Sequence, residues 1–126
     1  MSKLYKILVI DDEAEILALF NNFFKEKKYN ITSAACGLDA LKIIETKKEA
    51  FDIIITDLEL PDISGNAITA IAKKKWPEIP IIAMTGWGKD LQVLAEEAQA
   101  DLILSKPFNL PGLEKKIIKL FKKKNK

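Results

Sequence analysis

The sequence predicts an α/β fold, a (βα)5 chain whose five parallel strands form one doubly wound sheet. Short continuous apolar runs alternate with segments of helical periodicity, which is typical of a parallel sheet covered by helices on both faces. Several of the runs are rich in the β-branched residues that suit buried strands. The expected strands are Ile7–Ile10, Ile31–Ala35, Ile53–Thr56, Ile79–Met84 and Leu102–Leu104.

Helices are expected between and after these strands. In the first helix one face carries apolar side chains at helical spacing, and the last helix repeats the pattern; the two sets are Ile16, Phe20, Phe23 and Phe24, and Leu113, Ile117, Leu120 and Phe121. Proline and glycine punctuate the loops between them. The three remaining helices are expected near Leu38–Thr46, Asn66–Lys75 and Lys89–Ala98.

Length and composition indicate one domain. The chain has 126 residues, of which 48% are hydrophobic, enough for one packed core and too few for two ordinary domains. We expect a single domain over residues 1–126, with a core at about 5–121 and a lysine-rich tail at 122–126. A net charge of +2 creates no field that would demand nucleic acid or a membrane as partner. With one cysteine, Cys36, and no long apolar run, we expect a soluble cytoplasmic protein that does not bind DNA directly.

The absence of histidine from the chain restricts its chemistry. Ser-His and Cys-His nucleophilic catalysis and His-ligated zinc are excluded within this chain. Any reaction must therefore depend on carboxylates, hydroxyls and lysines.

Reactive side chains stand where the predicted strands end. Asp11 and Asp12 follow the first run, Asp57 closes the third, Thr85 closes the fourth and Lys106 lies just past the fifth. In a doubly wound sheet the carboxyl ends of the strands share one rim, where ligands bind. Three carboxylates on one rim repel one another and need a compensating cation. Oxygen ligands favour Mg²⁺ or Ca²⁺, and few carboxylates with room for a phosphoryl oxygen favour Mg²⁺.

This set of groups fits phosphoryl transfer. Asp57 can act as a nucleophile that forms an acyl phosphate, with the metal neutralising the incoming charge. The Thr85 hydroxyl and the Lys106 ammonium are the donors that a phosphoryl group in transit requires.

Each residue also has a simpler interpretation. Asp11 or Asp12 could cap the first helix, and Asp57 could be a loop-starting acid before a turn at Pro61. Thr85 could be a strand-end hydroxyl and Lys106 a solvated lysine. Their convergence on one rim favours a common site.

The motifs around these residues resemble the response-regulator receiver domain of two-component signalling, in its chemotaxis-regulator-like form, over nearly the whole chain. The motifs are Val9-Ile10-Asp11-Asp12-Glu13, Ile55-Thr56-Asp57, Leu60-Pro61-Asp62-Ile63-Ser64-Gly65, Met84-Thr85-Gly86 and Ser105-Lys106-Pro107-Phe108. The resemblance implies a flavodoxin-like sheet with strand order 2-1-3-4-5.

The resemblance also assigns roles. Asp12 would bind Mg²⁺ directly and Asp11 through water, while Asp57 would be both ligand and phosphoacceptor, and the backbone carbonyl of Glu59 would complete the metal site. Thr85 and Lys106 would bind the phosphoryl oxygens, and the peptide bond between Lys106 and Pro107 would be cis. A sensor histidine kinase, a phosphotransfer protein or a small acyl phosphate would be the donor. Phosphorylation would change partner binding through the surface of the fourth and fifth helices.

Some positions depart from the usual pattern of this family. Ile103 stands where a tyrosine or phenylalanine is usual, so the coupling of Thr85 to an aromatic side chain is expected to differ. Gly86 replaces a residue with a side chain. Glu59 and Trp87 occupy the positions that flank the attacking water and tune the lifetime of the phosphate.

Two other functions remain open on the sequence. A Mg²⁺ phosphohydrolase with Asp57 as nucleophile would use the same groups but would turn over external phosphate esters. A constitutive interaction module would keep the fold without accepting phosphate. A switch would catalyse only its own phosphorylation and dephosphorylation.

Overall fold

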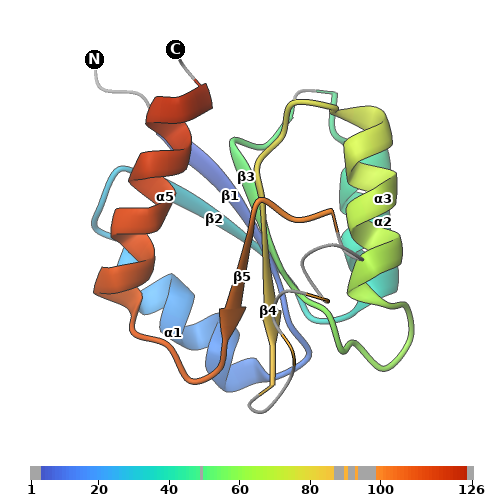
Figure 1. The fold of residues 1–126 in the computed structure, drawn as a ribbon, viewed down its shortest axis with the longest axis horizontal. Helices are drawn as coiled ribbons and strands as arrows, with labels where there is room; N and C mark the ends of the chain where they lie inside the picture. The colour runs from blue at the N-terminus through green and yellow to red at the C-terminus, as the bar shows by residue number, and fades with distance from the viewer. Residues whose placement is uncertain (1–3, 49, 87–89, 91–92, 94–98, 125–126) are drawn as a thin grey trace.

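Five parallel strands form a single sheet in the order β2-β1-β3-β4-β5, as the sequence analysis predicts (Figure 1). The computed structural model describes residues 4–48, 50–86, 90, 93 and 99–124. The strands are β1 (Tyr5–Ile10), β2 (Tyr29–Ala34), β3 (Ile53–Asp57), β4 (Ile81–Thr85) and β5 (Leu102–Ser105). The helices in the described part of the chain are α1 (Ala14–Phe24), α2 (Gly37–Thr46), α3 (Gly65–Lys75) and α5 (Leu110–Lys124).

Strand bounds differ from the predicted ones by one or two residues. Both β1 and β2 begin two residues earlier than expected, and β2 begins at Tyr29, where the tyrosine ring packs edge-on against Phe24 at 4.9 Å between centroids. β4 begins later than expected, at Ile81, because Ile79 belongs to a turn in which its N–H donates to the Trp76 carbonyl. Trp87 and most of the helix expected at Lys89–Ala98 lie outside the described residues.

The core has two layers because neighbouring side chains of a strand point to opposite faces of the sheet. In β3, Ile53 and Ile55 pack toward α1 and α5, whereas Ile54 packs toward α2 and α3. Figure 1 shows α1 and α5 on one side of the sheet and α2 and α3 on the other. Each of these helices is amphipathic, and within the described residues none is long and apolar enough to cross a bilayer.

The register of the sheet aligns the ends of four strands. Ile10 pairs with Thr56, so the next residues along, Asp11 and Asp57, stand side by side. Asp57 pairs with Met84, and Thr85 pairs with Ser105. The ladder continues past the strands, since the Lys106 N–H donates to the Thr85 carbonyl at 2.8 Å. Strand pairing by itself therefore brings the polar strand-end residues to one rim.

Candidate functional site

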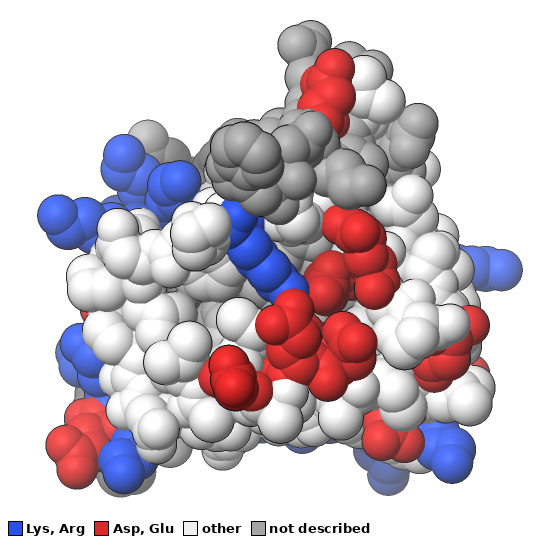
Figure 2. Space-filling view, turned by 90° about the horizontal axis from the view of Figure 1, so that it is seen from below, with Lys and Arg blue, Asp and Glu red and all other residues white. Residues whose placement is uncertain are grey.

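The Lys106 ammonium lies among three carboxylates at this rim. Its Nζ is 2.8 Å from Asp11 Oδ2, 3.0 Å from Asp57 Oδ2 and 3.2 Å from Glu13 Oε1. Asp11 and Asp57 are 0% and 5% exposed. Seen from the strand ends, acidic side chains gather on this face with a basic side chain lying among them (Figure 2). The predicted convergence of Asp11, Asp57 and Lys106 is therefore present in the structure.

Asp12 completes a cluster that can hold a metal ion. Asp11, Asp12 and Asp57 each offer a carboxylate oxygen, and these oxygens lie within 4.8 Å of one another. Oxygens at opposite corners of a Mg²⁺ octahedron are roughly 4.2 Å apart, since each bond is about 2.1 Å long. Small side-chain rotations would bring the three acids into one coordination shell. Asp12 is exposed, so an ion here would keep water ligands on its outer side, as Mg²⁺ commonly does.

The electrostatics of the site reflect the burial of like charges. Burial raises the pKa of the Asp11 carboxyl, and the hydrogen bonds from Lys106 and from the Glu13 N–H reduce this rise without cancelling it. Burial by itself lowers the pKa of Lys106, but the hydrogen bonds to Asp11 and Asp57 outweigh it and raise the pKa above the usual range of lysine. Lys106 is thus a permanent cation that offsets part of the negative charge.

Glu13 is a site residue that the sequence analysis missed. Its position directly after Asp11 and Asp12 was the available signal, and its carboxylate is the third acceptor of Lys106. Glu13 is also the N-cap of α1, without a side-chain capping bond. Since the N-cap is Glu13, neither Asp11 nor Asp12 is the N-cap of α1 as the simpler interpretation expected, although Asp11 Oδ1 accepts the Glu13 N–H at 2.8 Å. Asp11 therefore serves both the helix entry and the acidic cluster.

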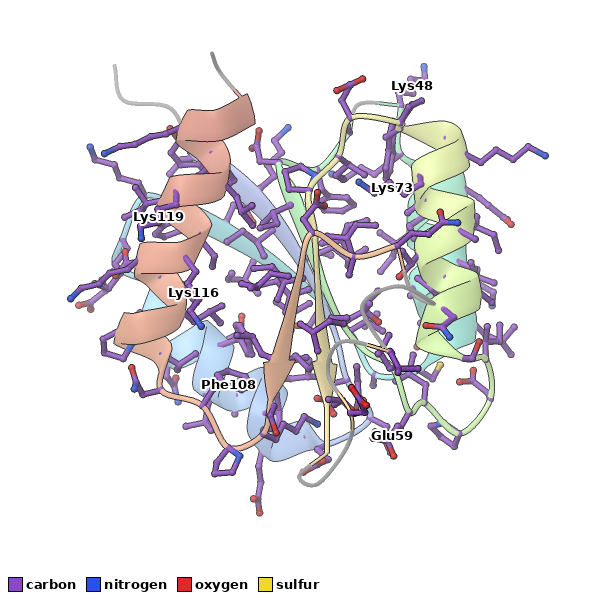
Figure 3. The ribbon with its side chains drawn as sticks, viewed as in Figure 1. Lys48, Glu59, Lys73, Phe108, Lys116 and Lys119 are labelled. Atoms are coloured by element: carbon purple, nitrogen blue, oxygen red, sulfur yellow. The ribbon has the colours of Figure 1, made fainter. Side chains whose placement is uncertain are left out.

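Thr85 is bound to the loop after β3. The side chain is 1% exposed, and its hydroxyl donates to Glu59 Oε1 at 3.1 Å. The Glu59 N–H in turn donates to Asp57 Oδ1 at 2.9 Å. Asp57, Glu59, Gly86 and Lys106 line one hollow of about 240 Å³, together with Asp12 and Glu13. Figure 3 shows Glu59 at the end of the molecule toward which β4 and β5 point, whereas Lys48 lies at the other end.

The turn after β3 is anchored from a distant segment. The Asp62 carboxylate accepts the backbone N–H groups of Gly37 and Leu38, each at 2.9 Å, at the start of α2. These hydrogen bonds lower the pKa of Asp62. Gly65 packs so tightly that a Cβ on it would lie 2.6 Å from Leu58 Cα. These contacts hold the turn between β3 and α3 in place beside Asp57.

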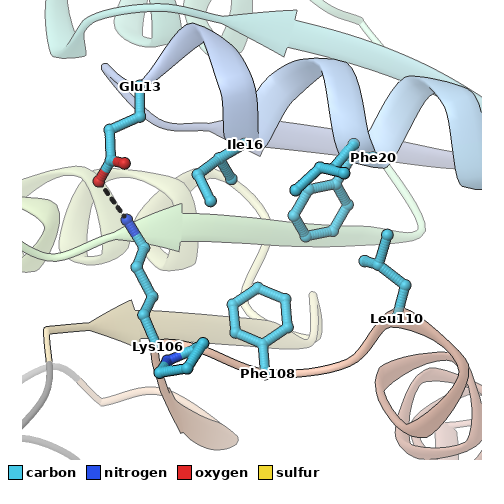
Figure 4. Close-up of a pocket in the computed structure, with 8 residues that line it drawn as sticks. Glu13, Ile16, Phe20, Lys106, Phe108 and Leu110 are labelled. Atoms are coloured by element: carbon cyan, nitrogen blue, oxygen red, sulfur yellow. Dashed lines mark hydrogen bonds and ion pairs between the residues drawn. The ribbon is translucent and has the colours of Figure 1, made fainter.

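A larger, mostly apolar hollow of about 400 Å³ opens beside Lys106, between α1 and the segment that joins β5 to α5. Figure 4 shows Ile16 and Phe20 facing Phe108 and Leu110, with the ion pair between Glu13 and Lys106 at one end. The peptide bond between Lys106 and Pro107 is cis, as the resemblance implied. On the other side of β5, Ile103 packs in a small cluster with Leu58 and Ala83.

The chain matches the family described as "Response regulator receiver domain" over residues 7–118. It belongs to this family. Aspartate phosphorylation and Mg²⁺ are typical of such domains, and the acidic cluster of this receiver domain fits that chemistry.

Named relatives agree with the assignment. The receiver domain is 35% identical over 106 residues to the regulatory protein VanRc of Enterococcus gallinarum, covering 82% of this chain and 44% of VanRc. It therefore spans less than half the length of curated relatives that it matches. A crystal structure of a response regulator receiver domain protein from Clostridium thermocellum superposes with a TM-score of 0.86 at 32% identity, covering 97% of this chain and 98% of that one.

A second similar structure was solved as a complex with Mg²⁺-BeF. The response regulator TrrA of Thermotoga maritima, in complex with Mg²⁺-BeF, is 34% identical, with a TM-score of 0.79 and coverage of 92% of this chain and 98% of that one. Family, fold and acidic cluster together identify a receiver domain with a candidate metal site.

Proposed function

We propose that this receiver domain is a phosphorylation switch that accepts a phosphoryl group on Asp57. The observation that carries the proposal is the 3.0 Å ion pair between Asp57 and Lys106 beside an acidic cluster that can hold a divalent ion. A nucleophile, a fixed cation and metal ligands at one rim are what phosphoryl transfer to a carboxylate requires. The domain would catalyse its own phosphorylation and dephosphorylation and no other reaction.

In the transfer step an Asp57 carboxylate oxygen bonds to phosphorus while the bond from phosphorus to the donor breaks. The electron pair of the broken bond leaves with the donor, which is a phosphohistidine or an acyl phosphate. The Glu59 N–H holds one Asp57 oxygen, and Lys106 holds the other. Lys106 and Thr85 are the groups that we expect to bind the oxygens of the transferred phosphoryl group.

Mg²⁺ is the cofactor that we propose for the acidic cluster. Asp12 and Asp57 would bind it directly, Asp11 through water, and Glu59 through its backbone carbonyl. When bound, the ion supplies positive charge that offsets the clustered acids and the incoming phosphoryl oxygens.

The donor that we propose is a sensor histidine kinase or a phosphotransfer protein. The apolar hollow between Ile16, Phe20 and Phe108 reaches Lys106 (Figure 4), whose ammonium pairs with Asp57, and it offers such a protein a contact surface. Output is proposed to be a change of binding partner at the surface of the fourth and fifth helices, in the cytoplasm. Phosphorylation adds charge and strong acceptors, which bias a two-state element.

The test is incubation with acetyl phosphate and Mg²⁺ followed by intact-mass measurement. The wild type is expected to gain one phosphoryl group, and Asp57→Asn is expected to gain none. An unmodified wild type would contradict the proposal and favour a constitutive interaction module. Sustained hydrolysis of an external phosphate ester, lost in Asp57→Asn, would instead favour a phosphohydrolase.

Asp57→Asn is also expected to raise the free energy of unfolding in EDTA, by about 1 kcal/mol. The substitution removes one buried like charge, while Lys106 keeps Asp11 and Glu13 as partners and the amide oxygen can still accept the Glu59 N–H. In the wild type, Mg²⁺ at about 100 times its Kd should add about 2.7 kcal/mol, because it binds the folded state. Asp57→Asn should remove most of that gain.

Urea denaturation with EDTA or Mg²⁺ measures both effects. Asp39→Asn is the matched control, since Asp39 is an exposed acid in the first turn of α2 and its loss should change stability by less than about 1 kcal/mol in either buffer. A less stable Asp57→Asn variant in EDTA would show that Asp57 contributes more through its ion pair than it costs through repulsion.

A further inference from the structure

The Glu59 side chain holds two donors at the end of β4 with a single oxygen. Glu59 Oε1 accepts the Thr85 hydroxyl at 3.1 Å and the Gly86 N–H at 3.0 Å. Glu59 comes from the loop after β3, so this oxygen bridges two neighbouring strand ends. The two donors converge on one anionic oxygen, which is the geometry of a small oxyanion site.

These donors cannot serve two acceptors at full strength. A hydroxyl has one proton to donate, and so has a backbone N–H. While both point at Glu59, neither is available to an oxygen of a phosphoryl group on Asp57. Asp57, Glu59 and Gly86 line the same hollow, so the carboxylate and a phosphoryl group would compete within one small volume.

Gly86 is what allows the carboxylate to come so close. A Cβ at Gly86 would lie 3.3 Å from Glu59 Oε1, a tight contact that would shift the carboxylate by a few tenths of an ångström and weaken its hydrogen bond to the Gly86 N–H. The sequence has glycine at residue 86, where the family usually has a residue with a side chain. The structure shows what this glycine permits, which is the close approach of the Glu59 carboxylate.

We propose that the Glu59 carboxylate is a built-in competitor of the phosphoryl group, which holds Thr85 and Gly86 in the unphosphorylated arrangement. The proposal rests on the phosphorylation of Asp57 proposed above and makes Glu59 a positioning residue that acts through Thr85. Phosphorylation has to displace one oxyanion by another on the same two donors. Removing the acceptor shifts the population toward free donors before any phosphoryl group arrives.

The test compares Glu59→Ala with Glu59→Gln. Alanine removes the acceptor, whereas glutamine keeps an acceptor oxygen at the same reach and removes the charge. With acetyl phosphate and Mg²⁺, Glu59→Ala should be modified about tenfold faster than the wild type, because the loss of the acceptor that holds Thr85 and Gly86 increases the fraction of molecules with both donors free by about this factor. Glu59→Gln should stay within about threefold of the wild-type rate. Gly86→Ala should also be faster, because it displaces the carboxylate without removing it.

A second measurement reports on the donors without any reaction. In ¹H–¹⁵N spectra of the unphosphorylated proteins, the Gly86 amide of Glu59→Ala should move toward the position that it takes in the phosphorylated wild type, and that of Glu59→Gln should stay near the wild-type position. A structural role of Glu59 alone would lower stability without producing this shift or a faster reaction.

The outcomes separate the two proposals. Equal acceleration in Glu59→Gln and Glu59→Ala would assign the effect to repulsion between the Glu59 charge and acetyl phosphate, and it would overturn the competitor role. Equal rates in all three proteins, with the wild type modified, would overturn it as well and leave the phosphorylation of Asp57 intact. If no variant gains mass, the proposed function fails and the competitor role fails with it.

Discussion

Lys106→Met is expected to lower the free energy of unfolding by about 3 kcal/mol in the absence of divalent metal. Three carboxylates share this ammonium, and breaking a buried ion pair from one side leaves uncompensated charge in a poorly hydrated place. The side chains of Asp11 and Asp57 are 0% and 7% exposed, so water cannot replace the lost partner. Methionine has a similar length and flexibility, so the loss of packing is small.

Divalent metal and acid should each reverse part of this loss. Mg²⁺ supplies the missing positive charge to the same carboxylates, so the deficit should be smaller in Mg²⁺ than in EDTA. Because the pKa of Asp11 is raised in the folded state, the folded protein binds its proton before the unfolded chain does. Stability therefore increases as the pH falls through that raised pKa toward the ordinary value of 3.8. Because Lys106 lowers the pKa of Asp11, its loss raises that pKa further, so the deficit of Lys106→Met should narrow as the pH falls from the pKa of Asp11 in the variant to its pKa in the wild type.

Lys27→Met is the matched control, measured by urea denaturation at the same pH values. Lys27 pairs with Glu114 at 3.4 Å, and its side chain is 41% exposed. Exposed pairs of this kind contribute about 0–1 kcal/mol, so the control should show a small loss that does not depend on Mg²⁺. Equal losses in the two variants would mean that Lys106 acts as an ordinary surface lysine and that the acids around it do not repel strongly.

The fold can be predicted from the sequence because the signals involved are local. Continuous β-branched runs such as Ile53–Thr56 can be buried on both faces, and the structure places them in the centre of a parallel sheet. Once the strands are parallel, Asp11, Asp57 and Lys106 must come to the same rim, and their pairing follows from the register. The strand order itself came from the family resemblance, since the apolar runs do not encode which strand lies beside which.

Contacts chosen by side-chain rotamers were beyond the sequence analysis. Asp62 caps α2 across 25 residues of sequence, and no local pattern connects an aspartate in a turn with the start of a preceding helix. The resemblance implies that Glu59 gives its backbone carbonyl to the metal and occupies a position that flanks the attacking water, and neither expectation points to the hydrogen bond that its carboxylate accepts from Thr85. Such partners depend on how two loops meet in space after the sheet has formed, and residue type alone leaves several partners equally favourable.

Gly65→Ala is the second substitution with a large expected effect, because its methyl group would meet backbone atoms. A Cβ at Gly65 would contact the Asp57 carbonyl oxygen and would lie 2.6 Å from Leu58 Cα. Backbone atoms at the end of a central strand cannot turn away as the end of a side chain can. Either α3 or the end of β3 has to move, and overpacking of this kind costs about 1–3 kcal/mol. We expect a loss near the upper limit.

The same displacement should slow phosphorylation, which makes the variant informative about function as well as stability. Gly65 contacts the backbone of Asp57 itself, so a shift there changes the position of the nucleophile relative to Lys106. A misplacement of about 1 Å can cost about 100-fold in rate, and we expect modification by acetyl phosphate to slow at least tenfold under conditions where the variant is folded.

Gly112→Ala separates this close approach from the general effect of adding a methyl group to a helix. A Cβ at Gly112 would lie 2.8 Å from Asn109 Oδ1, and this side chain can rotate away. The rotation gives up the 2.6 Å hydrogen bond from the Gly112 N–H to Asn109 Oδ1, a loss of about 0.5–2 kcal/mol at a helix N-terminus. Alanine also gains up to about 1 kcal/mol of helix propensity over glycine, so the control should stay within about 1 kcal/mol of the wild type and keep its phosphorylation rate. If Gly65→Ala also kept its stability within about 1 kcal/mol of the wild type and kept its phosphorylation rate, the end of β3 would be able to move with little loss of stability. A fixed position of Asp57 could then not be a requirement of the reaction.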